Sequence, residues 1–248
     1  MAYNFLIAPD FAPERFAGWH LLNTLLQKRM NAQIHLLTPA SHTEQCETVL
    51  QGNVSVIYAN PFDATALIRE HGYRAIARPI AKPDEMVIAS ASEGTIKQLT
   101  DLKPEHSVAM ADNRDVKLIG LRLLEAVDLT ENDLQWKTTE TYQAAARQVI
   151  KGEADVAFFL AEAFHSLARL TKSQLNVLIE SQLNDISHVV LVKQDWDKAD
   201  QFAEILLNLH QDSEGADALT ELGFAQGFEV MHEEDAEFMI DLMDTLID

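Results

Sequence analysis

Residues 49–56 read VLQGNVSV and residues 149–156 read VIKGEADV, so a similar stretch recurs 100 residues further along the chain. In both copies an apolar segment runs into a glycine and a short strand-like segment follows. Glycine is the residue that most often ends a helix, because it adopts the left-handed backbone conformation without steric cost. Each stretch therefore predicts a junction between a helix and a buried strand. The recurrence indicates two equivalent halves.

The segments around the two junctions follow the same order. Apolar periodicity predicts strands in the first half at 3–8, 34–37 and 54–58, with helices at 13–30, 41–51 and 60–71. It predicts strands in the second half at 107–111, 134–138 and 154–159, with helices at 115–127, 141–151 and 161–170. Strands that alternate with helices are typical of parallel sheets covered on both faces.

Two further apolar strands, 86–91 and 188–192, stand outside the repeats, and only helices are expected after them, at 197–209, 214–222 and 232–247. A chain that enters the second half by one strand and leaves it by another needs a hinge of two strands. We therefore expect an α/β protein with two Rossmann-like lobes joined by a two-stranded hinge. Lobe one comprises residues 1–86 with 190–248, and lobe two comprises residues 87–189.

The composition excludes several classes of function. With 39 acidic and 19 basic residues the net charge is −20, which repels nucleic acids and anionic lipid. One cysteine allows no internal disulfide, and no segment is apolar enough to span a membrane. The N-terminal residues lack the features of a signal peptide. We expect a cytoplasmic protein, or a periplasmic one if a leader has been removed.

The order of these segments resembles the type 2 periplasmic-binding-protein fold, and more narrowly the phosphate/phosphite/phosphonate-binding proteins of ABC importers. The matching residues are 49–58 with Asn60-Pro61-Phe62, 142–156 with Gly152-x-x-Asp155, and Leu222-Gly223-Phe224 with Gly227-Phe228. The resemblance implies a substrate-binding protein that closes two lobes on a small polar ligand. The partner it implies is a transporter; a sensor or an enzyme is the alternative.

The chain departs from that family where the anion would be held. The family has a turn rich in serine and threonine at the start of the first helix of lobe two, whereas residues 112–117 here read DNRDVK. One tyrosine of the family falls on His42 here, and a second falls near Asp84. A histidine of the family falls on Tyr142. Asp84 and Asp115 would repel a phosphonate dianion, although Arg114 and Lys117 could offset them. We therefore expect the fold without the phosphonate ligand.

The candidate ligand-binding residues lie at the ends of predicted strands and at the starts of predicted helices, where α/β proteins bind ligands. Ser41 and Asn60 are also interpreted as helix N-caps, and Asp84 as a surface carboxylate. The loop Pro9-Asp10-Phe11 follows the first strand. The full set is Asp10, Ser41, His42, Asn60, Asp84, Arg114, Asp115, Tyr142 and Glu162.

Three other features receive a structural interpretation. Cys46 is expected to be a small buried hydrophobic residue rather than a nucleophile, because Val49 and Leu50 lie one helical turn away. The run His232-Glu233-Glu234-Asp235 is expected to complement a helix dipole rather than to bind metal. His188 is expected to be a core or hinge residue.

Three functions stay open at this point. The first is a solute-binding protein, which we favour. The second is a degenerate binding fold used as an interaction or sensory module. The third is a cofactor-biosynthesis enzyme on the same scaffold, with His42 and Asp84 or Glu162 as acid and base. No catalytic residue, cofactor or metal is assigned, since the chain has no phosphate-binding glycine loop, zinc-ligand spacing or nucleophile elbow.

Overall fold

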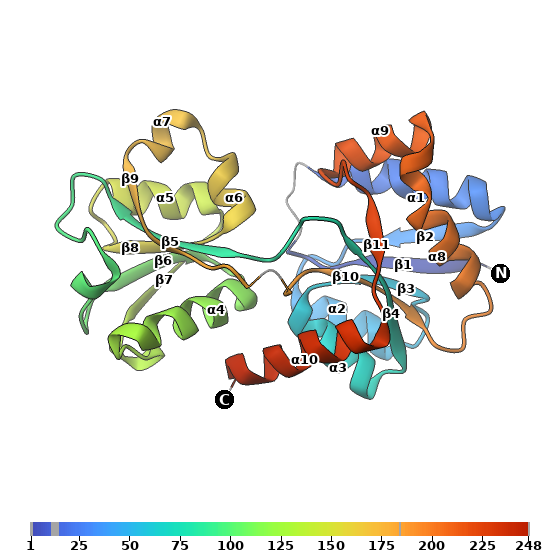
Figure 1. Cartoon of the computed structure of the whole chain (residues 1–248), viewed down its shortest axis with the longest axis horizontal. Helices are drawn as coiled ribbons and strands as arrows, with labels where there is room; N and C mark the ends of the chain where they lie inside the picture. The colour runs from blue at the N-terminus through green and yellow to red at the C-terminus, as the bar shows by residue number, and fades with distance from the viewer. Residues whose placement is uncertain (1, 11–14, 184, 248) are drawn as a thin grey trace. The chain divides into compact units, whose positions relative to one another are not determined.

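The computed structural model describes residues 2–10, 15–183 and 185–247. They form two compact units. Unit 1 comprises Met1–Pro83 and Ser187–Thr245, and unit 2 comprises Asp84–Ile186 with Leu246–Asp248. The chain thus passes from one unit to the other after Pro83 and returns after Ile186. Each unit is built around its own sheet (Figure 1).

Unit 1 contains a six-stranded sheet in the order β11-β4-β10-β3-β1-β2. Strand β1 is parallel to both β2 and β3, whereas β10 is antiparallel to β3 and β4, and β11 is antiparallel to β4. The strands are β1 (Ala2–Ile7), β2 (Gln33–Leu37), β3 (Val56–Ala59), β4 (Tyr73–Pro79), β10 (Val189–Lys193) and β11 (Phe228–Val230).

Helices cover both faces of this sheet. Figure 1 shows α1, α8 and α9 on one side and α2, α3 and α10 on the other. Because successive strand residues point to opposite faces, Phe5 and Ile7 pack into the first layer and Leu6 into the second. The helices are α1 (Phe16–Met30), α2 (His42–Leu50), α3 (Pro61–Glu70), α8 (Ala199–Leu207), α9 (Ser213–Leu222) and α10 (Glu233–Ile247).

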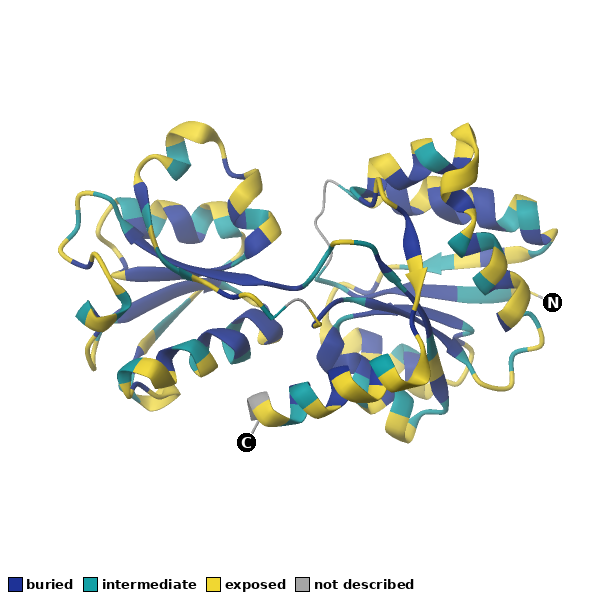
Figure 2. Ribbon diagram, viewed as in Figure 1, coloured by how far each residue is buried: buried dark blue, intermediate teal, exposed yellow. Residues whose placement is uncertain are grey.

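Unit 2 contains a five-stranded sheet in the order β7-β6-β8-β5-β9. Its strands β5, β6 and β8 are almost wholly buried (Figure 2). Helix α4 packs on one face, and α5 with the short α6 and α7 on the other. The elements are β5 (Met86–Ala91), β6 (Ser107–Ala111), α4 (Arg114–Leu124), β7 (Gln135–Thr139), α5 (Tyr142–Ile150), β8 (Val156–Leu160), α6 (Ala161–Ser166), α7 (Arg169–Lys172) and β9 (Leu175–Glu180).

The two sheets have the same plan. In unit 1 the strand order β2-β1-β3-β10-β4 matches the order β7-β6-β8-β5-β9 in unit 2. In each series the fourth strand is antiparallel to the third, and it is the first strand after the chain has passed from the other unit. Both expected junctions are present, because Gly52 (φ 76°) follows α2 and Gly152 (φ 70°) follows α5. The expectation of equivalent α/β halves is therefore confirmed.

Several elements differ from the sequence interpretation. Strands β4, β9 and β11 were not expected; Arg74 and Arg78 interrupt the apolar pattern of β4, and β11 lies in a region expected to hold only helices. The helix expected at 161–170 is divided into α6 and α7, and the helix expected at 13–30 begins at Phe16 in the described part. Short 3-10 turns occur at Leu99–Asp101, Glu125–Val127, Glu131–Asp133 and Leu209–Gln211. Across the described residues, every helix is too short or too polar to traverse a lipid bilayer.

Candidate functional site

The carboxyl ends of β1 and β3 meet the start of β10 at one edge of the unit 1 sheet. Ile7 of β1 lies opposite Tyr58, and Ala59 lies opposite Val189, the first residue of β10. Loop residues that follow a parallel strand and those that precede its antiparallel neighbour therefore come together at this edge. Asp10, Asn60 and His188 occupy these positions.

Asp10 is held by donors from both neighbouring segments. His188 Nε2 lies 3.3 Å from Asp10 Oδ2, and Asn60 Nδ2 donates to the same oxygen at 3.4 Å. Burial opposes ionisation of this carboxyl, but the charge and hydrogen bond of His188, with hydrogen bonds from its own backbone and Asn60, hold its pKa below the ordinary value. Among the described residues, no hydrogen-bond partner reaches the second, buried oxygen Oδ1.

A second buried carboxylate, Asp63, lies one helical turn beyond Asn60. Its oxygen Oδ2 accepts from Gln45 Nε2 at 2.6 Å and from Asn60 Nδ2 at 3.0 Å, and Oδ1 lies 3.2 Å from His42 Nδ1. Asn60 therefore connects the two aspartates. We call Asp10, His42, Gln45, Asn60, Asp63 and His188 the unit 1 polar cluster.

Aromatic packing fixes His188, one of the two histidines of this cluster. The His188 ring stacks on Tyr58 with centroids 5.0 Å apart and planes 21° apart. Tyr58 in turn packs against Trp19, with centroids 4.7 Å apart, so the stack continues into the apolar layer under α1. His188 is thus mostly buried, but it is a polar-cluster member rather than a plain core residue.

The helix starts near the cluster have the capping geometry expected from the sequence. Ser41 Oγ accepts from Glu44 N at 3.2 Å, and Asn60 Oδ1 accepts from Asp63 N at 2.8 Å. These capping predictions are confirmed. Ser41 is exposed and its hydroxyl serves as this cap, so the structure brings Asp10, His42 and Asn60 together but not Ser41.

The interpretation of Cys46 as a buried residue is wrong. Cys46 is exposed, and its Sγ lies 3.4 Å from His42 Nε2. The buried positions of α2 are Gln45 and Val49, four residues apart, which turns Cys46 and Leu50 outward. Gln45 occupies the inner position because its amide nitrogen donates to Asp63.

In unit 2 one backbone N–H at the start of α4 is already occupied by a side chain of the protein itself. Asn113 accepts from Val116 N at 3.0 Å, and Asp115 is 5% exposed. Arg114, the first residue of α4, is exposed. Lys117 pairs with Glu131 and lies 4.6 Å from the centre of the Trp136 ring, so its charge is engaged away from the helix start.

The remaining candidates of unit 2 lie on three separate elements. Asp84 is 9% exposed, so its interpretation as a surface carboxylate is wrong; its main-chain N–H donates to Ile186 O at 2.7 Å. Tyr142 is the half-buried first residue of α5, and its ring packs against Phe159. Glu162 is exposed in the first turn of α6. Phe11, of the loop expected after the first strand, lies outside the described residues.

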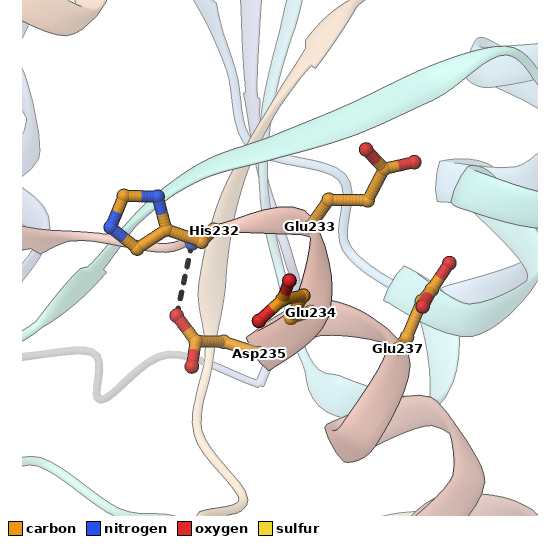
Figure 3. Close-up of a pocket in the computed structure, with 5 residues that line it drawn as sticks. All are labelled: His232, Glu233, Glu234, Asp235 and Glu237. Carbon is orange, nitrogen blue, oxygen red and sulfur yellow. Dashed lines mark hydrogen bonds between the residues drawn. The ribbon is translucent and has the colours of Figure 1, made fainter.

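The acidic run at the start of α10 lines an open hollow of unit 1 (Figure 3). Asp235 accepts from His232 N at 3.0 Å, whereas the carboxyl groups of Glu233 and Glu237 point away from the His232 ring. Acidic residues in a first helical turn stabilise the helix dipole. Within the part of the chain that the structure describes, no group of three metal-ligating side chains gathers here or elsewhere.

Sequence reasoning missed Asp63, Gln45 and His188. Asp63 had a local signal, because it stands three residues after the N-cap Asn60. His188 had none, since its neighbours Asp10 and Tyr58 are far away in the sequence and meet it only through the pairing of β10 with β3.

A family model described as "ABC transporter, phosphonate, periplasmic substrate-binding protein" matches residues 5–236. No curated protein matches the chain. The family consists of periplasmic proteins, so the expectation of a cytoplasmic location has no support.

Solved structures share the fold at low sequence identity. A binding protein of a phosphonate ABC transporter from Pseudomonas aeruginosa is 13% identical, with a TM-score of 0.81 over 98% of this chain and 86% of that one. PhnD1 from Prochlorococcus marinus with methylphosphonate is 12% identical, with a TM-score of 0.82 over 99% and 98%. A Xanthomonas citri protein bound to ATP is 12% identical, with a TM-score of 0.81 over 100% and 98%. The type 2 periplasmic-binding-protein fold is confirmed.

Proposed function

The chain belongs to the family of periplasmic substrate-binding proteins of phosphonate ABC transporters, and from that membership we propose that it binds a small polar solute other than a phosphonate. In this proposal lobe one (1–86 with 190–248) and lobe two (87–189) close on the solute. A closed state is populated only when the ligand binds it more tightly than the open state. The protein then carries the solute through the periplasm to a transporter.

The observation that carries the proposal is the unit 1 polar cluster. It places two carboxylates, Asp10 and Asp63, at the sheet edge where α/β proteins hold ligands, and Asn60 connects them. The pKa of Asp10 is held below its ordinary value, so this group is ionised at neutral pH. A ligand that offers N–H groups or a positive charge suits a site with two carboxylates, whereas the two carboxylates repel a phosphonate dianion.

The helix α4 in unit 2 supports the same choice of ligand. A helix start binds an anion through free backbone N–H groups. Here Asn113 occupies the N–H of Val116, the carboxylate of Asp115 is buried, and the charge of Lys117 is engaged by Glu131. These contacts disfavour a dianion at this position.

A thermal-shift panel tests the proposal. Purified protein is heated with methylphosphonate and phosphate in one group, and with putrescine, basic amino acids and neutral amino acids in the other. A ligand at 100 times its dissociation constant adds about 2.7 kcal/mol, which raises the melting temperature by roughly 5–11 °C, at about 2–4 °C per kcal/mol for a chain of this size. We expect a rise in the second group, lost in Asp10→Asn and retained in Asp217→Asn, an exposed position on α9.

Each other outcome changes a defined part of the proposal. A rise with methylphosphonate would leave a solute-binding protein and overturn the exclusion of phosphonate. No rise with any compound would contradict solute binding and favour the interaction module. Chemical conversion of a bound compound, detected by mass spectrometry, would favour the enzyme. For that function the sequence suggested Asp84 or Glu162 as the acid–base partner of His42, whereas in the structure His42 contacts Asp63.

A further inference from the structure

Cys46, His42 and Asp63 form a chain of three chemically active groups on unit 1. Cys46 Sγ lies 3.4 Å from His42 Nε2, and His42 Nδ1 lies 3.2 Å from Asp63 Oδ1. Residues 42 and 46 are four apart on α2 and therefore share one face of the helix. A thiol within hydrogen-bond reach of an imidazole, itself oriented by a third group, is the arrangement that activates a nucleophile.

We propose that Cys46 is a covalent-modification site that exchanges with small, uncharged or cationic disulfides, with His42 as the base and Asp63 as its positioning residue. The exchange does not depend on solute binding. It gives the one cysteine of the chain a role that neither its family nor its fold assigns.

The contacts of Asp63 determine the tautomer of His42. An ionised carboxylate only accepts hydrogen bonds, so its contact with Nδ1 requires the proton of the neutral ring to be on Nδ1. Nε2 then carries a lone pair directed to the thiol. Asp63 is 8% exposed and its other oxygen accepts from Gln45 and Asn60, so the carboxylate is fixed in place.

The environment of the thiol makes this base necessary. Partial desolvation of the exposed side chain, and then the negative charge of Asp63, raise the pKa of Cys46, so the thiol is protonated at neutral pH. The thiolate is the reacting species in disulfide exchange. It must therefore form during the reaction, by proton transfer to His42 Nε2, and Asp63 stabilises the imidazolium.

The exchange balances without any further reactant. The Cys46 proton moves to His42, and the sulfur attacks one sulfur of the disulfide and forms a new S–S bond. The old S–S bond breaks, and the leaving thiolate takes the proton from His42. The products are a mixed disulfide at Cys46 and one equivalent of a small thiol.

A second observation concerns Gln45, the side chain that holds Asp63 in place. Gln45 is 2% exposed and donates through Nε2 to Asp63, so its carbonyl lies within the same cluster. Among the described residues, no donor reaches that carbonyl oxygen Oε1. The proposed class of reagent, uncharged or cationic disulfides, follows from the charge of the protein. The net charge of −20 favours the same class of reagent over anions.

The test uses neutral dithiodipyridine, cationic cystamine and anionic dithiobis(nitrobenzoate) on the full chain. Release of thiol gives the rate constant, and intact mass gives the adduct. The variants are His42→Gln, Asp63→Asn and Cys46→Ser, with His35→Gln as a matched surface control in β2. The His42 side chain is 57% exposed, so we expect His42→Gln to retain the fold. Each rate is divided by that of the same variant unfolded in urea, which removes the intrinsic reactivity of the thiol.

We expect one adduct per wild-type chain, none in Cys46→Ser, and a rate at least about a hundredfold lower in His42→Gln, the lower end of general-base contributions. His35→Gln should react as wild type does. Asp63→Asn should slow the wild type but have no effect in the His42→Gln background, which a purely structural role would not produce. An unchanged rate in His42→Gln, the absence of any adduct, or a preference for the anionic reagent would overturn the proposal.

Discussion

His188 Nε2 lies 3.3 Å from Asp10 Oδ2, so the second residue after the chain returns to unit 1 holds the carboxylate that follows its first strand. This contact joins two segments that are more than 170 residues apart in the sequence. The contact links the loop after β1 to the start of β10, and it therefore contributes to the stability of unit 1 as well as to the candidate site.

Asp10→Asn should reduce the free energy of unfolding at neutral pH by about 1–3 kcal/mol, because the variant weakens a buried charge-assisted contact. The pKa of Asp10 is lowered in the folded state from an ordinary value of 3.8. The contribution of the carboxylate is therefore complete above that value, and it is lost as the pH falls below it. Urea unfolding at neutral pH and at low pH measures both. A gap between variant and wild type that does not shrink in acid would contradict this account.

Ser41→Ala and Thr141→Ala should each cost about 1 kcal/mol, because each removes the side-chain acceptor of a helix start. Ser41 Oγ accepts from Glu44 N, and Thr141 Oγ1 accepts from Ala144 N at 3.1 Å. The two losses should add in the double variant, since the caps lie in different units. Glycine at either position should recover most of the loss. Urea unfolding that is unchanged in the alanine variants would show that the caps do not contribute.

Gly120→Ala should destabilise unit 2 by about 1–3 kcal/mol through overpacking. A Cβ at this position of α4 would lie 2.2 Å from Cε2 of the buried Phe158. Phe158→Leu should relieve part of the loss, which a double-mutant cycle of unfolding energies measures as a coupling. Gly52→Ala is the control: its Cβ meets no atom within 4 Å, so it carries only the backbone strain of φ 76°. A loss in Gly120→Ala that Phe158→Leu does not relieve would exclude overpacking.

Asp155→Ala should cost about 1 kcal/mol, a charge-assisted hydrogen-bond value discounted for the exposure of the carboxylate. Asp155 Oδ2 accepts from both the backbone N and the Oγ of Ser107 at 2.7 Å, which ties the start of β8 to β6. Burial opposes ionisation, but these bonds hold the pKa of Asp155 below its ordinary value. The loss should therefore disappear in acid, below a pH of about 4. A loss that persists in acid would point to packing instead.

The elements that could be predicted are those whose signals are local. The junctions at Gly52 and Gly152 and the caps at Ser41 and Asn60 depend on residues within one or two turns, and the structure has all four. Strand β4 was missed because Arg74 and Arg78 interrupt the apolar pattern from which strands were predicted. Its pairing with β10 and β11 stabilises it regardless.

The candidate site was predicted only in part, because it depends on which strands become neighbours. Asp10 and Asn60 follow parallel strands and could be assigned to one sheet edge. His188 joins them only because β10 inserts next to β3, an antiparallel pairing that no local pattern in 188–192 indicates. Cys46 was misplaced because the polar Gln45, stabilised by Asp63, takes the inner face of α2.

The plan of the sheets also determines the order in which the protein can form during synthesis. The sheet of unit 1 needs β10 between β3 and β4, and β10 leaves the ribosome only after all of β5 to β9. The sheet of unit 2 consists of one uninterrupted segment, from Met86 to Glu180. The middle of the polypeptide therefore completes its sheet first, while the N-terminal strands wait with the edges of β3 and β4 unpaired. Unpaired strand edges promote aggregation, so we expect the N-terminal strands to be the aggregation-prone part of the chain until β10 has been made.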